Sequence, residues 1–296
     1  MVHILAALVL FALLAVGPVL GPAPVRAELI IGLTNANALV TFDSATPGTV
    51  SAPISITGIG SETLFDIDIR PADKQLYGLS SAGRIYTINQ TTGAATLNAS
   101  VSGTNLDPAA TRFGIDFDPT ADQLRVVAST GQNLRVIPAT GVTSIDNNLS
   151  GAGTGAVSVA YTNNDTNPAT NTMLFYIGPS TPNTLFNTSD QNSGVLAALG
   201  PLGVSSTQDV GFDISGLSGI GFASLTSPTG SGSSLFRINL STGAATLVGT
   251  IDSGLTVRGI ALSPAASVPG PSSLMLLGTG VAGALIYVLR RRSIRR

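Results

Sequence analysis

The chain has 296 residues, of which 34 are Gly, 17 are Pro and only 10% are charged, with no Cys, no Trp and one His. This length suits one large domain or two small ones, and its Gly, Ser, Thr and Asn favour short strands and tight turns. Zinc, copper and haem sites and His-dependent nucleophilic catalysis need imidazole or thiolate groups, so the composition excludes them. Carboxylate chemistry and hard cations with oxygen ligands remain open.

Residues 1–27 are predicted to be a signal peptide. An apolar run over residues 4–16 precedes Gly and Pro, and Val25, Arg26 and Ala27 fit a signal-peptidase site. We expect signal peptidase to cut between Ala27 and Glu28, which removes His3 and exports the body. The alternative is a membrane anchor that stays uncut, but the apolar run is short for that role.

The body that follows is acidic. All 16 acidic residues lie between Glu28 and Asp252, and residues 28–268 contain eight basic residues, so their net charge is −8. Nucleic-acid binding needs a basic surface to neutralise phosphates, so nucleic acid is excluded as a partner. Without Cys there are no disulfides, and the exported fold depends on its own core.

A repeat runs through the body. Its first strand recurs around five apolar residues spaced by 48, 44, 53 and 48 positions: Ile67, Ile115, Val159, Phe212 and Ile260. A period of 40 to 50 residues with four short strand signals per unit is typical of a β-propeller blade.

The unit over residues 65–100 shows all four strand signals. Alternating apolar and polar residues predict strands over 65–69, 75–81, 84–89 and 94–99. The hairpin between the third and fourth strands recurs four times and always ends in Gly, which we expect at a positive φ that other residues avoid. These glycines are Gly48, Gly93, Gly141 and Gly243.

The two ends of the body complement each other. The segment from Leu29 supplies the second, third and fourth strands of a blade, and residues 257–264 supply a first strand alone. Together they complete a fifth blade, and a closed ring leaves no open sheet edge. We therefore predict an all-β, five-bladed propeller over residues 28–265, closed by its C-terminal strand. Six blades or a distorted sandwich are the alternatives, because the fourth unit is irregular.

Acidic residues follow the first strands, which lie nearest the axis of a propeller. Strand residues two apart point to the same face, so we expect their carboxylates to gather near the centre. One way to compensate their charge is pairing with Arg70, Arg112 or Arg258 and with backbone N–H groups of the next blade. The other is calcium, a hard cation that prefers oxygen ligands. The candidate ligands are Asp66, Asp68, Asp116, Asp118 and Asp213, and Asp107 with Asp165 form a candidate second site in loops.

The C-terminal 31 residues, 266–296, combine a Pro-rich joint, 16 apolar or small residues at 274–289 and an Arg cluster. The apolar stretch predicts a transmembrane helix whose arginines stay in the cytoplasm, so an ordinary C-terminal anchor is one interpretation. The arrangement also resembles the PEP-CTERM sorting signal of Gram-negative bacteria. That resemblance implies cleavage near the joint by an exosortase-type membrane protease and release of the body. Gly270 stands where the signal has Glu, and the matching residues are Val268, Pro269, Pro271, Ser272, Ser273, Arg290, Arg291 and Arg292.

The body itself resembles an uncharacterised family of secreted bacterial domains of unknown function. The resemblance rests on segments such as "ETLFDIDIRPADKQLYGL", "AGRIYTINQTTGAATL" and "DQLRVVASTGQNLRV", and it covers most of residues 29–264. It implies export but brings no activity, cofactor or catalytic residue.

Two function classes remain after these exclusions. The first is a non-enzymatic surface or matrix protein, associated with exopolysaccharide or other surface proteins, in a structural or binding role. The second is a carboxylate-dependent hydrolase of polysaccharide. The body has only Glu28, the expected new N-terminus, and Glu62, which fits a turn or inter-blade hydrogen bond. Sugar-binding Trp is absent, and three of the four Tyr residues alternate with apolar residues as core residues of strands do, so the first class is favoured. The four Tyr residues are Tyr77, Tyr86, Tyr161 and Tyr176.

Overall fold

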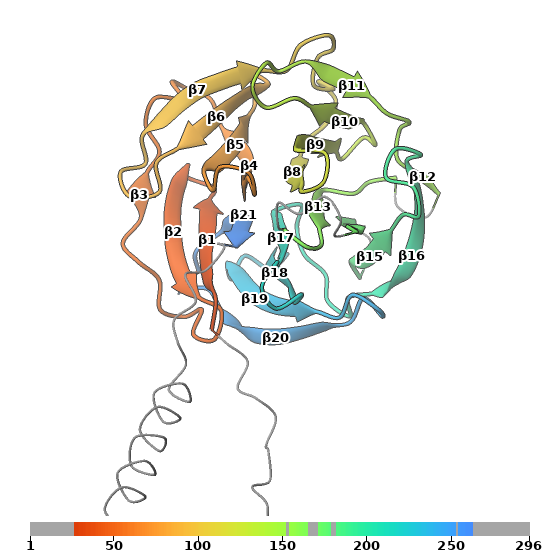
Figure 1. Ribbon diagram of the computed structural model, residues 1–296. Coiled ribbons are helices and arrows are strands. Elements are labelled where there is room, and N and C mark those ends of the chain that lie inside the picture. Colours follow the sequence, from red (N-terminus) through yellow and green to blue (C-terminus); the bar gives the residue numbers. More distant parts are fainter. Residues whose placement is uncertain (1–26, 152–153, 165–170, 179–181, 253, 263–296) are drawn as a thin grey trace, which may run out of the picture.

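The computed structural model describes residues 27–151, 154–164, 171–178, 182–252 and 254–262. Five sheets surround a common axis in a closed ring, as Figure 1 shows. This confirms the five-bladed, all-β propeller and rules out the six-bladed and sandwich alternatives.

Blade one joins the two ends of the body. Its sheet runs from the axis outward as β21 (Val257–Leu262), β1 (Leu29–Thr34), β2 (Ala38–Asp43) and β3 (Ile54–Ser55). β1 and β21 pair antiparallel, with Ile30 opposite Leu262 and Gly32 opposite Ile260. The predicted closure by the C-terminal strand is therefore confirmed.

The other blades each begin at the axis and proceed outward along the chain. Blade two contains β4 (Leu64–Ile69), β5 (Leu76–Ser80), β6 (Arg84–Ile88) and β7 (Ala95–Ser100). Blade three contains β8 (Phe113–Asp118), β9 (Gln123–Ala128), β10 (Asn133–Val136) and β11 (Thr143–Ile145). Blade five contains β17 (Val210–Ile214), β18 (Gly221–Thr226), β19 (Ser233–Ile238) and β20 (Ala245–Thr250).

Blade four is the irregular one. It contains β13 (Ser158–Tyr161), β14 (Leu174–Gly178), β15 (Thr184–Asn187) and β16 (Val195–Pro201). The short β12 (Ser150–Gly151), which arrives from blade three, adds a fifth strand parallel to β16 at the outer edge.

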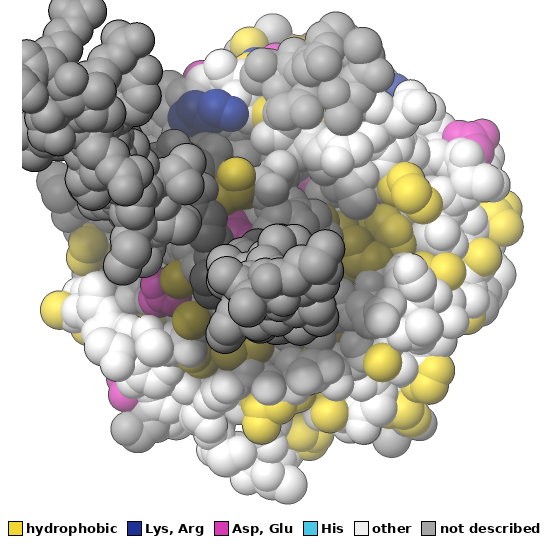
Figure 2. Space-filling model, turned by 60° about the horizontal axis from the view of Figure 1, so that its bottom comes forward, with side chains coloured by type: hydrophobic (Ala, Val, Ile, Leu, Met, Phe, Trp, Pro, Cys, Tyr) yellow, Lys and Arg dark blue, Asp and Glu magenta, His cyan; other side chains and the backbone are white. Residues whose placement is uncertain are grey.

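The core lies between the blades. Five clusters of buried apolar residues each combine side chains from two neighbouring sheets, one cluster for every junction around the ring. On the face shown in Figure 2, hydrophobic side chains are scattered among small polar ones and charged side chains are sparse. The ring is thus held by its own apolar core, as the absence of Cys requires.

The hairpin glycines join blades at the rim. Gly93, Gly141 and Gly243 have φ of +71°, +75° and +79°, as predicted, and Gly194 repeats the arrangement in blade four at +71°. A Cβ on Gly141 would lie 1.8 Å from the carbonyl oxygen of Ser100 in the preceding blade, so only Gly fits this contact. Gly48 does not adopt a positive φ, and the expectation for it was wrong. Its hairpin is one residue longer and turns through Pro47 before it.

The predicted signal peptide and C-terminal sorting segment fall almost wholly outside the described residues. Within the described ranges, no helix is both long enough and apolar enough to cross a membrane.

Candidate axial carboxylate site

The innermost strands β4, β8, β13, β17 and β21 surround the axis and form a layer of five equivalent residues. A shared hydrogen-bond pattern defines these positions. The Asp68 carboxylate accepts the N–H of Phe117 at 2.8 Å, Asp116 accepts that of Tyr161 at 3.2 Å, and Asp213 accepts that of Leu262 at 2.6 Å. Each of these amides belongs to the next innermost strand of the ring. The five positions are Asp68, Asp116, Ala160, Asp213 and Ala261.

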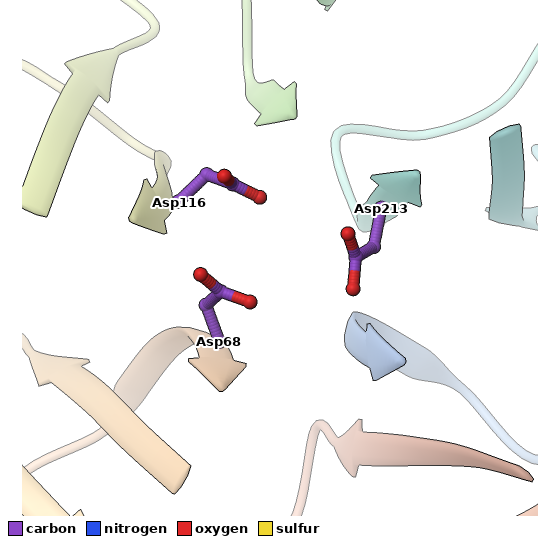
Figure 3. Close-up of side chains that lie close together, drawn as sticks. All are labelled: Asp68, Asp116 and Asp213. Atoms are coloured by element: carbon purple, nitrogen blue, oxygen red, sulfur yellow. The ribbon is translucent and has the colours of Figure 1, made fainter. Parts of the chain in front are cut away.

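We call Asp68, Asp116 and Asp213 the axial triad. One carboxylate oxygen from each lies within 4.8 Å of those from the other two, and the three residues are 1–3% exposed. Figure 3 shows the three carboxylates arriving from different strands and converging on the same space. The expectation that first-strand carboxylates gather near the centre holds for these three residues.

Burial dominates the electrostatics of the triad. Loss of water raises the pKa of Asp68 and of Asp116 well above the usual range, and repulsion from the neighbouring carboxylates raises each further. Desolvation likewise raises the pKa of Asp213 to about 7, although the amides of Leu262 and Ile214 oppose the shift. A proton or a bound cation would therefore stabilise the triad by compensating its negative charge.

Asp66 lies on the same face of β4 as Asp68 but outside the triad. Its carboxylate accepts the Ile115 N–H at 3.1 Å. Desolvation raises its pKa to about 7, and the nearby Arg112 guanidinium partly offsets that rise. Arg112 is buried and donates to Phe65 O at 2.6 Å, to Gln208 O at 3.2 Å and to Arg258 O. It thus links the innermost strands of blades one and two to the segment that enters blade five.

Asp118 does not join the triad either. It is the last residue of β8, and its Oδ1 accepts three hydrogen bonds from the turn that follows: Thr120 N at 2.8 Å, Thr120 Oγ1 at 2.7 Å and Ala121 N at 3.1 Å. This carboxylate caps its own turn, so the structure brings together three of the five candidate ligands.

The predicted arginine partners behave differently from one another. Arg70 pairs with Asp73 and Asp122 at the turns that follow the first strands of blades two and three. Arg258 donates to Leu64 O at 3.3 Å and Asn35 O at 3.2 Å. Of these three arginines, only Arg112 acts on a first-strand carboxylate, that of Asp66. Backbone amides of the next blade supply the rest of the predicted compensation.

The loop-borne candidate site is only partly described. Asp107 accepts hydrogen bonds from Thr130 Oγ1 at 2.6 Å and from Ala109 N at 2.9 Å. The Thr130 hydrogen bond is the main cause that lowers the pKa of Asp107. Asp165 lies outside the described residues.

Both glutamates of the body make structural contacts. Glu28 is buried, and its carboxylate accepts the hydroxyls of Ser215 and Ser218 in the β17–β18 turn. Glu62 pairs with Arg84, and the Tyr86 hydroxyl lies 3.3 Å from both of its carboxylate oxygens. Glu62 was expected to bond to a turn or to another blade, but the partners of its carboxylate lie on β6 of its own blade.

Comparison with known sequences decides the family. The domain of unknown function DUF4394 matches residues 38–261, which is most of the chain. This chain belongs to the DUF4394 family. Among curated proteins, none matches the sequence.

Several solved structures resemble the DUF4394 propeller at low identity. A putative 6-phosphogluconolactonase from Bacteroides fragilis is 12% identical, with a TM-score of 0.41 over 79% of this chain and 70% of that one. TolB from Acinetobacter baumannii is 14% identical, with a TM-score of 0.45 over 80% and 67%. The gluconolactonase XC5397 from Xanthomonas campestris is 14% identical, with a TM-score of 0.43 over 79% of each chain. These likenesses assign no activity to the DUF4394 chain.

The DUF4394 propeller also has a surface groove of about 490 Å³ on blade two. It lies between the β4–β5 turn and the β6–β7 hairpin, and amide, hydroxyl and apolar side chains line it together with Lys74. None of its lining residues carries a carboxylate, so the groove does not supply the paired acids of a hydrolase.

One buried network of the DUF4394 chain was not anticipated from the sequence. Arg125 is fully buried and donates to Tyr161 Oη at 3.1 Å, Asn133 Oδ1 at 2.9 Å, Asp146 Oδ2 at 2.6 Å and Asn192 Oδ1 at 3.0 Å. These contacts tie blade three to blade four. A signal was available, because the repeat aligns Arg125 with Tyr77, a core residue of blade two.

Proposed function

We propose that this protein is a non-enzymatic propeller of the cell surface or extracellular matrix, with a structural or binding role. The observation that carries this proposal is the burial of the axial triad. Its carboxylates accept amide hydrogens from neighbouring blades, so they bridge the ring instead of facing a polymer. A glycosidase needs two carboxyl groups, about 5–10 Å apart, on either side of a bound sugar. Glu28 and Glu62, the other acids considered for such a role, are committed to structural partners.

Export is part of the same proposal. Signal peptidase would cut between Ala27 and Glu28, and an exosortase-type protease would cut near residues 268–273. The strands of the described residues all lie within 29–262, so both cuts would leave every blade intact. In support, Ala27 is exposed and Glu28 is buried, and the Glu28 N–H donates to Ser44 Oγ at 2.9 Å. The released body would meet exopolysaccharide or other surface proteins.

The export proposal is tested by fractionating cells of the host and sequencing both ends of the protein. We expect a body in the envelope or medium that begins at Glu28 and lacks the Arg cluster. A chain that retains Met1 and stays in the cytoplasm would contradict export.

The non-enzymatic proposal is tested on the host's own exopolysaccharide. We expect the purified protein to release no reducing ends. Release that disappears in an Asp116→Asn variant but not in an Asp118→Asn variant would instead establish a hydrolase that uses the axial carboxylates.

A further inference from the structure

The layer of five axial positions is unevenly filled. Three positions carry the triad carboxylates, and two carry the small side chains of Ala160 and Ala261. Three carboxylates converge here, and backbone amides, not arginines, donate the hydrogen bonds that join them to the next blade. The Arg112 guanidinium acts on Asp66, which lies two residues away along β4.

A second, independent observation concerns Ser158. This residue is fully buried, and among the described residues its hydroxyl has no hydrogen-bond partner. Ser158 lies two residues before Ala160 on β13, so both side chains lie on the same face of the strand. Burying a hydroxyl without a partner is costly, and coordination of its oxygen to a cation would relieve this cost.

Asn164 contributes a further unused oxygen at the other end of β13. Its Oδ1 is buried without a hydrogen-bond partner among the described residues, and its side chain also interacts with Asp213. Two side-chain oxygens therefore lack partners in the described part of the chain: the Asn164 amide oxygen, whose side chain interacts with Asp213, and the hydroxyl of Ser158 on the innermost strand β13.

We propose that the axis of this propeller binds one calcium ion, held by Asp68, Asp116 and Asp213 and completed by the side-chain oxygens of Ser158 and Asn164. All five donors are oxygen atoms, the ligand type that hard cations take, and calcium accepts six to eight of them with flexible geometry. Ligand atoms on opposite sides of Ca²⁺ are separated by about 5 Å, against about 4 Å for Mg²⁺. The triad oxygens lie within 4.8 Å of one another, so they are close enough to share one such ion.

This inference stands apart from the proposed function, because a bound ion stabilises the ring whether or not the protein is exported. The ion would link β4, β8 and β17, which belong to three different blades. Calcium binding to the folded state alone raises stability by mass action.

The first test compares thermal unfolding of the full-length chain at pH 7.5 in millimolar calcium and in chelator. We expect the Tm in calcium to be higher by about 5–10 °C at a hundredfold excess over Kd. Equilibrium dialysis with calcium alone should find one ion per chain, and magnesium at the same concentration should give a smaller Tm shift. Identical Tm values together with no bound calcium would overturn the proposal, and an equal shift with magnesium would overturn the choice of cation.

The second test removes one ligand with minimal disturbance. Asp116 is the best position, because Asp116→Asn keeps a carbonyl oxygen to accept the Tyr161 N–H. We expect this variant to lose the Tm response to calcium. Asp118→Asn is the matched control, since Asp118 is a buried acid on the same strand whose carboxylate, among the described residues, accepts its hydrogen bonds from its own turn. A full calcium response in both variants would overturn the assignment, and the wild-type comparison remains decisive if Asp116→Asn does not fold.

Discussion

At the axis of this propeller, neighbouring blades are joined by carboxylates that accept amide hydrogens from the next innermost strand. At the rim, the same blades are joined mainly through backbone hydrogen bonds. There the segment that leaves each outer strand bonds to the outer hairpin of the next blade, as in Thr57 N to Gly93 O at 3.0 Å and Ser102 N to Gly141 O at 2.9 Å. Further bonds join Ser150 N to Gly194 O at 2.8 Å and Ala245 N to Leu202 O at 3.0 Å.

The difference lies in what each junction tolerates. The rim repeats one backbone arrangement, and its glycines allow no side chain between the blades. The axis varies from blade to blade, with Asp at three of the five equivalent positions and Ala at the other two. The rim thus fixes the spacing of the blades, whereas the residues at the axial positions can differ and can include groups that bind a ligand. The following predictions break or sharpen this contrast, from the largest expected effect to the smallest.

Removing the closing strand disrupts both junctions of blade one. Deletion of the chain from Val257 onward removes β21, which pairs with β1 and supplies the Leu262 N–H to Asp213. We expect cooperative unfolding, followed by circular dichroism, to be lost, because the edge of β1 and part of the core become exposed. A chain that ends at Ala265 is the control and should unfold cooperatively. Equal Tm values for the two chains would show that closure does not stabilise the ring.

Adding one methyl group at the rim should be the next most damaging change. Gly141→Ala combines a positive φ with a Cβ that would lie 1.8 Å from Ser100 O, so the backbone must move. We expect a loss of about 4 kcal/mol in the free energy of unfolding, measured by chemical denaturation. Gly203→Ala is the matched control, because its φ is +78° but no atom lies within 4 Å of the added Cβ. That variant should lose only about 1 kcal/mol, and equal losses at the two sites would refute a special role for the rim contact.

The axis should respond to pH where the rim does not. Asp66 and Asp213 have pKa values of about 7 in the folded state, against 3.8 ordinarily, so the folded state retains protons that the unfolded chain releases. Their protonation stabilises fully below pH 4, and this contribution is lost as the pH rises through 7. In chelator, we expect the Tm to fall by about 5 °C or more between pH 5 and pH 8. The Arg112 charge reduces the loss of stability when Asp66 ionises, and the Glu28 charge increases the loss when Asp213 ionises.

Calcium should flatten this pH profile, because the ion replaces the protons as the partner of the triad. The Gly141→Ala variant is the control for the profile, since it changes only the rim. A Tm in chelator that stays constant from pH 5 to pH 8 would refute the raised pKa values.

Much of this arrangement could be read from the sequence, because the repeat sets the strands and their order. Alternation within the strands placed Asp68 and Asp116 at the axis, and the incomplete units at the two ends predicted blade one. Asp118 was misplaced because it ends its strand, where capping of the next turn takes precedence over alternation. The Arg125 network depends on partners up to 67 residues away, and nothing local in the sequence indicates which acceptors such a side chain reaches.

The pairing of β1 with β21 joins residues at opposite ends of the body, Ile30 and Leu262. During synthesis, the inner edge of β1 therefore has no partner until β21 has been synthesised and has reached it. Blades two to five can each form from contiguous chain, but the last junction must overcome the loop-closure entropy of more than 200 residues. Long-range pairing of this kind slows folding, so ring closure is expected to be the late and rate-limiting event. A chain halted before residue 257 would carry four complete blades and an open edge on β1 that invites pairing with another molecule.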